Sequence, residues 1–248
     1  ILFIVKGTVF EQFCSGETLD ESFETVKKLN NKNVKSYLHY SVEGLENEYS
    51  YDKSLEEVLS SIEFVAKKPI LDFTVFKPTA IASTRILKKV SSNEPLDEKE
   101  KILFDKSLNR FDKICFAAYK RNVRVLIDAE ESWIQNAIDD IVLSMMIKYN
   151  KEKAIVFNTS QMYRHDRLNY LKTLHNKALK NNFFLGIKLV RGAYIEKENK
   201  RAKRNNYLSP ICRSKELTDK NFNNGVSFIL SNLDKFSLFS GTHNEESI

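Results

Sequence analysis

The stretch GIKLVRGAY, residues 186–194, decides how this chain is expected to fold. It begins as an apolar strand and ends in a turn built on Gly192 and Ala193. Side chains alternate between the two faces of a strand, so Lys188 and Arg191 fall on opposite faces. A cation on the inner face of a buried strand needs a partner, and small residues at the strand end let a ligand approach the backbone. The pattern favours an anionic ligand at the carboxyl end of a strand; the alternative is an edge strand whose two cations face solvent.

The composition is that of an ordinary globular protein: 248 residues, 42% hydrophobic and 29% charged. No apolar run approaches the roughly 18 residues that span a bilayer. The net charge is +6, but basic residues are interspersed with acidic ones. Even the basic run KRAKR (200–204) follows Glu196 and Glu198, so a solvated helix face is expected and not a nucleic-acid site. Three cysteines without a CxxC pair indicate a reducing compartment and argue against a zinc or disulfide framework.

Strands and helices are expected to alternate along the chain. The segments predicted as strands are 34–40, 71–79, 123–131, 154–160, 185–194 and 236–244. Apolar residues at helical spacing predict helices over 53–67, 97–121, 133–145, 168–178 and 219–233, with 195–209 a charged loop or helix. Such alternation is typical of a parallel sheet with helical crossovers, which places the chain in the α/β class.

Polar residues follow most of the predicted strands, which is typical of the active-site face of a (βα)8 barrel. A dinucleotide-binding doubly wound sheet is not supported, because no GxGxxG is present. Six of the eight strand–helix units are counted. We therefore expect an incomplete (βα)8-type barrel over residues 34–248, preceded by a helical arm over residues 1–33, and we expect the sequence to be a fragment or a truncated product.

The strand ends together resemble proline dehydrogenase, the family of FAD-dependent proline oxidases. The motifs that carry the resemblance are FCSGE (13–17), YSVEG (40–44), VFKPT (75–79), LIDAEE (126–131), FNTSQMYRHDR (157–167), KLVRGAY (188–194), SPICRSKELTD (209–219) and GTHNEES (241–247). The resemblance implies a distorted barrel that holds FAD at its carboxyl face. The implied reaction oxidises L-proline to pyrroline-5-carboxylate by hydride transfer to flavin N5, with electrons passing to a membrane quinone.

The resemblance also implies which residues form the site. Lys77, Asp128 and Tyr194 would line the proline pocket. The residues implied to hold the flavin are Asn158, Lys188, Val190, Gly192, Ala193, Arg213, Thr242, His243 and Asn244. No metal site is implied. The partners implied are L-proline and a quinone, with peripheral membrane contact and no nucleic acid. An intracellular location follows: cytoplasmic or on the inner membrane in a bacterium, mitochondrial in a eukaryote.

The sequence departs from the family at three points. His39 stands where the family usually has Asp, and Ser160 stands where it usually has Tyr. The family grips the substrate carboxylate with an Arg pair on a last helix, which would lie beyond Ile248. Residues 1–248 alone are therefore expected not to oxidise proline.

The residues themselves suggest how the site would work. Asp128 shares strand parity with Leu126, so both are predicted to face the barrel interior, where Asp128 could pair with Lys77. Lys188 would supply the cation that stabilises a reduced flavin. For the FAD pyrophosphate, the candidate partners are Arg191, Arg213 and Lys215. His165 and His175 follow a helical pattern and are predicted to lie at the surface.

Two other functions stay open. One is a metal-dependent barrel hydrolase that uses Asp128, Glu130, His165 and His243 as ligands, although neither HxH nor HExxH spacing is present. The other is a non-catalytic remnant that keeps the fold without turnover. Flavin content would separate both from a proline dehydrogenase, since flavin absorbs visible light and zinc does not.

Overall fold

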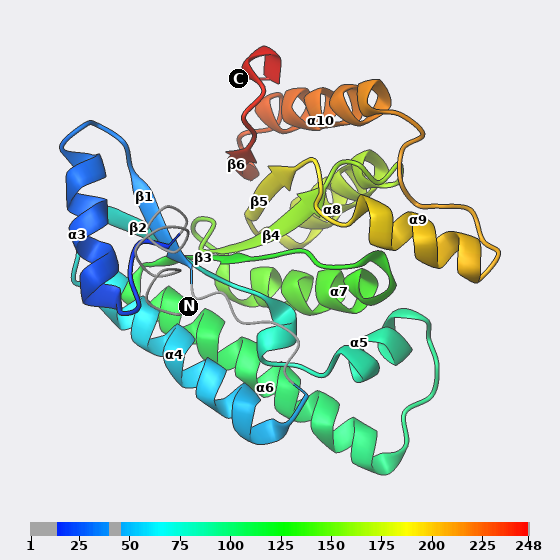
Figure 1. The fold of residues 1–248 in the computed structure, drawn as a ribbon, viewed down its shortest axis with the longest axis horizontal. Coiled ribbons are helices and arrows are strands. Elements are labelled where there is room, and N and C mark those ends of the chain that lie inside the picture. The colour runs from blue at the N-terminus through cyan, green and yellow to red at the C-terminus, as the bar shows by residue number, and fades with distance from the viewer. Residues whose placement is uncertain (1–13, 40–45, 248) are drawn as a thin grey trace, which may run out of the picture.

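Six parallel strands form one sheet that is bent into a half-barrel (Figure 1). The computed structural model describes residues 14–39 and 46–247. The strands are β1 (Ser36–His39), β2 (Leu71–Phe76), β3 (Arg124–Ile127), β4 (Val156–Gln161), β5 (Leu185–Val190) and β6 (Phe236–Gly241). They pair in chain order, each parallel to the next. The expected incomplete α/β barrel is thus confirmed, with strands shorter than predicted.

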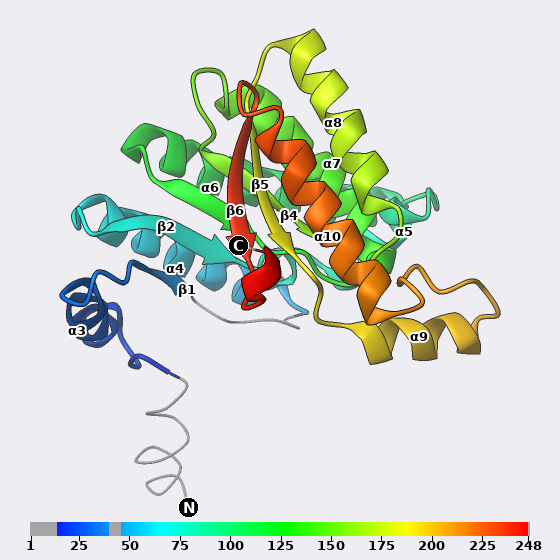
Figure 2. The ribbon, with the colours of Figure 1, turned by 90° about the horizontal axis from the view of Figure 1, so that it is seen from above.

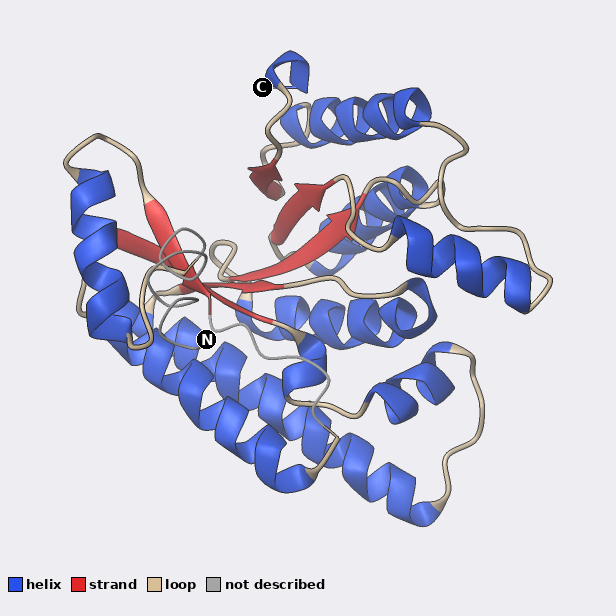
Figure 3. Cartoon of the chain, viewed as in Figure 1, coloured by secondary structure: helices blue, strands red, loops and turns tan. Residues whose placement is uncertain are grey.

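Helices cover the outer face of this sheet (Figure 2, Figure 3). They are α3 (Leu19–Asn30), α4 (Glu48–Ala66), α5 (Thr84–Ser91), α6 (Glu98–Arg121), α7 (Ser132–Tyr149), α8 (Arg167–Asn181), α9 (Ile195–Arg204) and α10 (Lys215–Leu230), with the 3-10 turns η2 (Pro78–Ala80) and η3 (Glu245–Ser247). The ends of α6 follow from its sequence: Asp97 and Glu100 form a capping box, and Asn122 ends the helix in the left-handed conformation. The short helix α5 was not predicted.

The main hydrophobic core lies between the outer face of the sheet and the helices. Strand residues such as Ile127 and Ile187 meet helix residues such as Ile114, Ile138 and Phe222, all without solvent exposure. Each such side chain contributes about 1.5–3 kcal/mol of transfer free energy. This layer fixes the curvature of the sheet and hence the directions in which its inner-face side chains point.

A smaller cluster fills the concave inner face. Val75, Leu126 and Phe157 are buried there. Aromatic rings close the interior further: Phe73 and Phe239 pack edge to face with ring centroids 5.3 Å apart, and Tyr37 on β1 meets Phe239 at 5.7 Å. The interior is therefore filled with rings in its lower part, and the polar residues one step further along each strand are left to face the open end.

The predicted N-terminal arm is helical where it is described. Helix α3 lies beside β1 (Figure 1), and its Phe23 packs edge to face on Phe64 of α4 at 5.6 Å. Phe23 and Val26 belong to the same core as the rest of the chain. Residues 1–13 of the arm, and the YSVEG motif apart from its final Gly44 neighbours at 46 onward, lie outside the described residues.

Two further expectations have clear outcomes. His165 is exposed, as predicted, but His175 is not at the surface: its ring is half-buried and packs against Phe228 and Phe236. The segment 195–209 begins as helix α9, whose basic residues lie largely in solvent. Among the described residues, we find no helix long and apolar enough to cross a membrane.

Candidate active site

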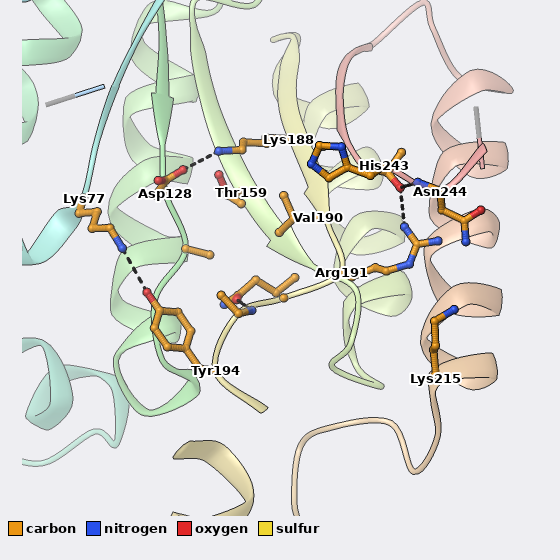
Figure 4. A pocket seen from close by; sticks show the side chains of 16 residues that line it. Lys77, Asp128, Thr159, Lys188, Val190, Arg191, Tyr194, Lys215, His243 and Asn244 are labelled. Atoms are coloured by element: carbon orange, nitrogen blue, oxygen red, sulfur yellow. Dashed lines mark hydrogen bonds and ion pairs between the residues drawn. The ribbon is translucent and has the colours of Figure 1, made fainter. Parts of the chain in front are cut away.

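A cavity of about 630 Å³ opens at the carboxyl ends of the strands (Figure 4). Its lining residues come from five consecutive strands and the segments that follow them: Lys77, Asp128, Ala129, Thr159, Gln161, Lys188, Val190, Arg191, Gly192, Ala193, Tyr194, Lys215, Gly241, Thr242, His243 and Asn244. The strand register explains the convergence. Thr159 pairs with Lys188, and Lys188 with Phe239, so inner-face residues of neighbouring strands lie at one level of the barrel.

An ion pair lies at the centre of this cavity. Lys188 Nζ donates to Asp128 Oδ1 at 2.8 Å, and His39 Nε2 lies 3.9 Å from Asp128 Oδ2. The Lys188 and Asp128 side chains keep only 12% and 16% of their exposure. Asp128 faces the interior with Leu126, as parity predicts. The predicted partner was Lys77, however, and the lysine at hydrogen-bond distance from Asp128 is Lys188, which its register on β5 aims across the barrel.

Lys77 and Tyr194 meet at the rim of the cavity. Lys77 Nζ donates to the Tyr194 hydroxyl at 3.3 Å, which joins the end of β2 to the start of α9 (Figure 4). Burial raises the pKa of the Tyr194 hydroxyl, and the nearby Lys77 ammonium acts in the opposite direction. The phenol therefore stays protonated near neutral pH and offers both a hydrogen-bond donor and a ring face to a ligand.

Arg191 lines the opposite side and is held by three segments. Its guanidinium donates to Asp219 Oδ1 at 2.5 Å, to Thr242 Oγ1 at 2.6 Å and to Ser247 Oγ at 3.0 Å. It also stacks over the Phe222 ring, 4.5 Å from the centroid. These contacts fix the cation beside the cavity, on a different wall from the Lys188 ion pair.

The turn after β5 depends on Gly192. Its φ is +137°, and a Cβ built there would lie 2.5 Å from the ring of Tyr163. An L-residue is strained in this backbone region and would also displace the ring. The glycine thus brings the backbone against Tyr163 and lets Ala193 and Tyr194 continue along the cavity wall.

We expect Gly192→Ala to lower the free energy of unfolding by about 1–3 kcal/mol, the cost of a strained backbone plus overpacking against Tyr163. Urea denaturation measures the change. Ala193→Ser is the matched control in the same turn: Ala193 is exposed and has no positive φ, so a change within about 0.5 kcal/mol is expected. Equal effects of the two substitutions would contradict this account of the turn.

Sequence comparison assigns the family. The family model described as proline dehydrogenase matches residues 22–248. The chain belongs to the proline dehydrogenase family. The match begins within helix α3, so most of the predicted arm that the structure describes falls inside the family's domain.

Individual relatives agree with this membership. The chain is 35% identical to the carbapenem antibiotics biosynthesis protein CarD of Pectobacterium carotovorum subsp. carotovorum, over 95% of this chain and 62% of that protein. It is 32% identical to proline dehydrogenase 1, mitochondrial, of Dictyostelium discoideum, over 99% of this chain and 50% of that protein. The chain thus spans between half and two thirds of the length of these relatives.

A solved structure supports the fold. The proline utilization A protein (PutA) of Bdellovibrio bacteriovorus, inactivated by N-propargylglycine, superposes with a TM-score of 0.85 at 18% identity. The match covers 99% of this chain and 27% of that protein. At this identity the likeness establishes the barrel arrangement of the elements and nothing about the ligands.

Most residues that the family resemblance implies for the site do line the cavity. The substrate candidates Lys77, Asp128 and Tyr194 lie together there. So do the flavin candidates Lys188, Val190, Gly192, Ala193, Thr242, His243 and Asn244. Their assignment to proline or to flavin stays a prediction, since proximity to one cavity does not distinguish the two ligands.

Two flavin candidates are not brought to this cavity. The side chain of Asn158 points to the helix layer, where Nδ2 donates to Asp139 Oδ1 at 2.8 Å and to the Tyr170 hydroxyl at 3.0 Å. Its parity on β4 is opposite to that of Phe157, which faces the interior. Arg213 lines a separate cavity together with Cys212 and other residues outside the barrel.

Ser160 shares the outward parity of Asn158. It is buried, and its hydroxyl lies 3.6 Å from Met162 Sδ. The departure from the family's Tyr at this position therefore leaves the described lining of the cavity unchanged. His39, in contrast, sits beside Asp128 and does alter the surroundings of that carboxylate.

Sequence reasoning missed two lining residues on β4, Thr159 and Gln161. Gln161 Nε2 donates to the Glu130 carbonyl at 2.7 Å, and its Oε1 accepts from Ala193 N at 3.3 Å. Thr159 Oγ1 donates to the Ile127 carbonyl at 2.8 Å. Parity with the inward Phe157 was the signal that could have found both residues.

The four ligands suggested for a metal-dependent hydrolase do not form a cluster. Asp128 and His243 line the cavity, Glu130 is bonded to Thr79, and His165 lies at the separate cavity that contains Arg213. Within the described part of the chain, no group of three or more His, Cys, Asp or Glu side chains is placed to hold a metal ion.

Proposed function

We propose that this protein is an FAD-dependent proline dehydrogenase that oxidises L-proline to pyrroline-5-carboxylate. One observation carries the proposal: the ion pair of Asp128 and Lys188 and the contact of Lys77 with Tyr194 lie in a single cavity at the carboxyl ends of the strands. That end of a barrel is where catalytic residues gather. Membership of the proline dehydrogenase family supplies the reaction.

The donor set of the cavity fits an anionic dinucleotide. Four cationic side chains line it, and Asp128 is the carboxylate among the lining residues. Asp219 partly balances two of the cations, since it pairs with Arg191 and with Lys215 at 2.7 Å. The remaining excess of positive charge suits a pyrophosphate. The volume of about 630 Å³ also falls within the usual range for ligand pockets.

Each residue of the cavity then has a definite task. We assign Arg191 and Lys215 to the pyrophosphate and Lys188, beside His243 and Asn244, to the flavin ring. Bound FAD would supply the hydride acceptor for the reaction. Proline oxidation also removes a proton from the ring nitrogen, so we assign Asp128 to the substrate's ammonium group, where a carboxylate is the complementary partner.

Tyr194 and Lys77 complete the substrate side of the proposal. The flat phenol ring suits a small pyrrolidine ring, and the Lys77 ammonium holds the phenol in place through its hydroxyl. The same ammonium lies close enough to the cavity to attract a substrate carboxylate. These contacts would exclude water from one face of the substrate and orient its ring carbon toward the acceptor.

The electron acceptor and location follow from the family resemblance. We propose a quinone as the acceptor and peripheral contact with the membrane that holds it. A mitochondrial location is proposed if the source is a eukaryote, because the Dictyostelium relative is described as mitochondrial. In a bacterium the cytoplasm or the inner surface of the inner membrane is proposed.

We expect the intact purified protein to be yellow and to carry non-covalently bound FAD, which is released on denaturation. Anaerobic addition of L-proline is expected to bleach the flavin absorption, because the substrate reduces it. The measurement is the visible spectrum before and after proline, with D-proline as the control that should leave the spectrum unchanged.

Three outcomes would contradict the proposal. A colourless protein that cannot be reconstituted with FAD would remove the cofactor. Flavin that proline does not reduce would point to a different substrate. Weak flavin binding with no reduction would favour the non-catalytic remnant.

A further inference from the structure

A buried glutamate, Glu130, connects the ends of neighbouring strands just below the cavity. Its side chain is 4% exposed and does not line the cavity. Oε1 accepts from the Thr79 amide at 2.8 Å and Oε2 accepts from the Thr79 hydroxyl at 2.6 Å. A carboxylate that accepts two bonds from one residue fixes that residue both in position and in orientation.

The bonds to Thr79 determine where Lys77 lies. Thr79 is the middle residue of the turn η2, and Lys77 caps the amino end of that turn through its carbonyl, which accepts from Ala80 N at 3.0 Å. Two residues therefore separate the carboxylate contact from the Lys77 backbone. If η2 shifts, the Lys77 ammonium moves relative to the Tyr194 hydroxyl.

The backbone of Glu130 reaches the other side of the rim. Its carbonyl accepts from Gln161 Nε2, and Gln161 Oε1 in turn accepts from the Ala193 amide. Its amide donates to Gln135 Oε1 at 3.0 Å, which ties it to α7. One residue thus connects the segments that carry Lys77, Gln161 and the residue before Tyr194, and every polar group of that residue has a partner.

We propose that Glu130 is a positioning residue that holds Lys77 and Tyr194 at the substrate side of the cavity, through Thr79 on one side and Gln161 on the other. The inference rests on the proposed function for the meaning of the cavity, but the contacts themselves do not depend on it. The buried clamp between the turn η2 and β4 is a separate device from the Asp128–Lys188 pair, which lies inside the cavity.

The ionisation of Glu130 gives this clamp a pH dependence. Burial raises the pKa of Glu130 to about 7, against the opposing effect of the Thr79 hydrogen bonds. The neighbouring Glu131 also raises it, and the Lys77 ammonium lowers it; Lys197 on α9 pairs with Glu131, and Tyr194 faces the same group. Protonation removes an acceptor from one carboxyl oxygen, so the clamp is strongest above pH 7 and weakens as the pH falls below it.

The first test measures the clamp without any ligand. Hydrogen–deuterium exchange of the intact protein is followed in peptides that cover residues 77–81 and 191–195. Glu130→Ala is expected to raise exchange in both segments, and Thr79→Val, which keeps the amide but removes the hydroxyl, is expected to raise it in 77–81 alone. Glu100→Gln is the matched control: Glu100 is equally buried, but it pairs with Lys89 and Arg85 at the α5–α6 corner.

The second test follows proline oxidation against pH. Glu130→Ala is expected to raise KM for proline about tenfold with a smaller change in kcat, since a displaced rim weakens substrate placement. Glu130→Gln keeps the shape and is expected to recover most of this loss, but without the change in KM near pH 7 that the wild type shows. If Glu130→Ala does not fold, Thr79→Val still tests the clamp through its own KM and exchange.

The outcomes separate the two proposals. Unchanged exchange in both segments of Glu130→Ala, or of 77–81 in Thr79→Val, would overturn the positioning role whether or not proline is oxidised. Increased exchange with an unchanged KM would also overturn it. A wild-type protein that shows the exchange changes but neither binds FAD nor oxidises proline would support the clamp and sink the proposed function.

Discussion

Replacing Asp128 with alanine is expected to lower kcat/KM for proline about 10- to 150-fold while leaving FAD content nearly unchanged. The size corresponds to one charge-assisted hydrogen bond of about 1.5–3 kcal/mol to the substrate's ammonium group. Asp128 is 16% exposed in its side chain and lies in the cavity, bonded to Lys188. Its loss would leave the cavity without the carboxylate that the described lining residues provide.

Steady-state kinetics and the ratio of flavin to protein absorbance together check this prediction. Asp128→Asn keeps the shape and removes the charge, so it should lose nearly as much activity as the alanine variant. Asp72→Asn is the control, since Asp72 lies on β2 but is exposed and meets only Lys35 at 3.5 Å. Equal losses of FAD and turnover in Asp128→Ala would make Asp128 a structural residue, and loss of neither would remove it from substrate binding.

Strand parity made the core of this site predictable from sequence. The alternation in residues 186–190 placed Lys188 inward, and the parity of Asp128 with Leu126 did the same on β3. Both predictions are confirmed because a parallel sheet with helices on its outer face leaves one alternation free to face the interior. What parity does not give is the partner across the barrel, and so Lys77 was predicted where Lys188 lies.

The misplaced residues fall where alternation was not applied or does not hold. Asn158 was carried over from a motif, although its neighbours Phe157 and Thr159 face the interior and it must therefore face outward. Arg213 lies in the irregular segment between α9 and α10, where no period fixes a side-chain direction. A residue in such a segment is positioned by tertiary contacts, which a single sequence does not contain.

Tertiary contacts also explain the residues whose roles changed. Glu130 was a candidate metal ligand because it follows Asp128 in an acidic run, yet it accepts two bonds from Thr79, 51 positions away. His175 was expected at the surface from its helical pattern, but α10 and β6 bring Phe228 and Phe236 against it. Neither contact leaves a periodic signal in the sequence.

Replacing Lys188 with methionine is expected to weaken FAD binding about 10- to 150-fold and to lower the free energy of unfolding by roughly 3 kcal/mol. The first effect is the loss of a charge-assisted contact to the cofactor. The second arises because Asp128 is left without its partner at 2.8 Å; the estimate is at the low end for a buried pair, since both side chains keep some contact with solvent. Methionine keeps the apolar stem against Phe239.

A double substitution separates these two effects. In Lys188→Met with Asp128→Asn the unpaired charge is gone, so urea denaturation should recover most of the lost stability, whereas flavin titration should still show weak binding. Lys148→Met is the matched control, because Lys148 forms a 2.6 Å ion pair with Asp112 at the surface and is expected to change stability by no more than about 1 kcal/mol. Recovery of FAD affinity in the double variant would mean that Lys188 serves only to neutralise Asp128, and that another cation of the cavity, with Arg191 the first candidate, holds the flavin.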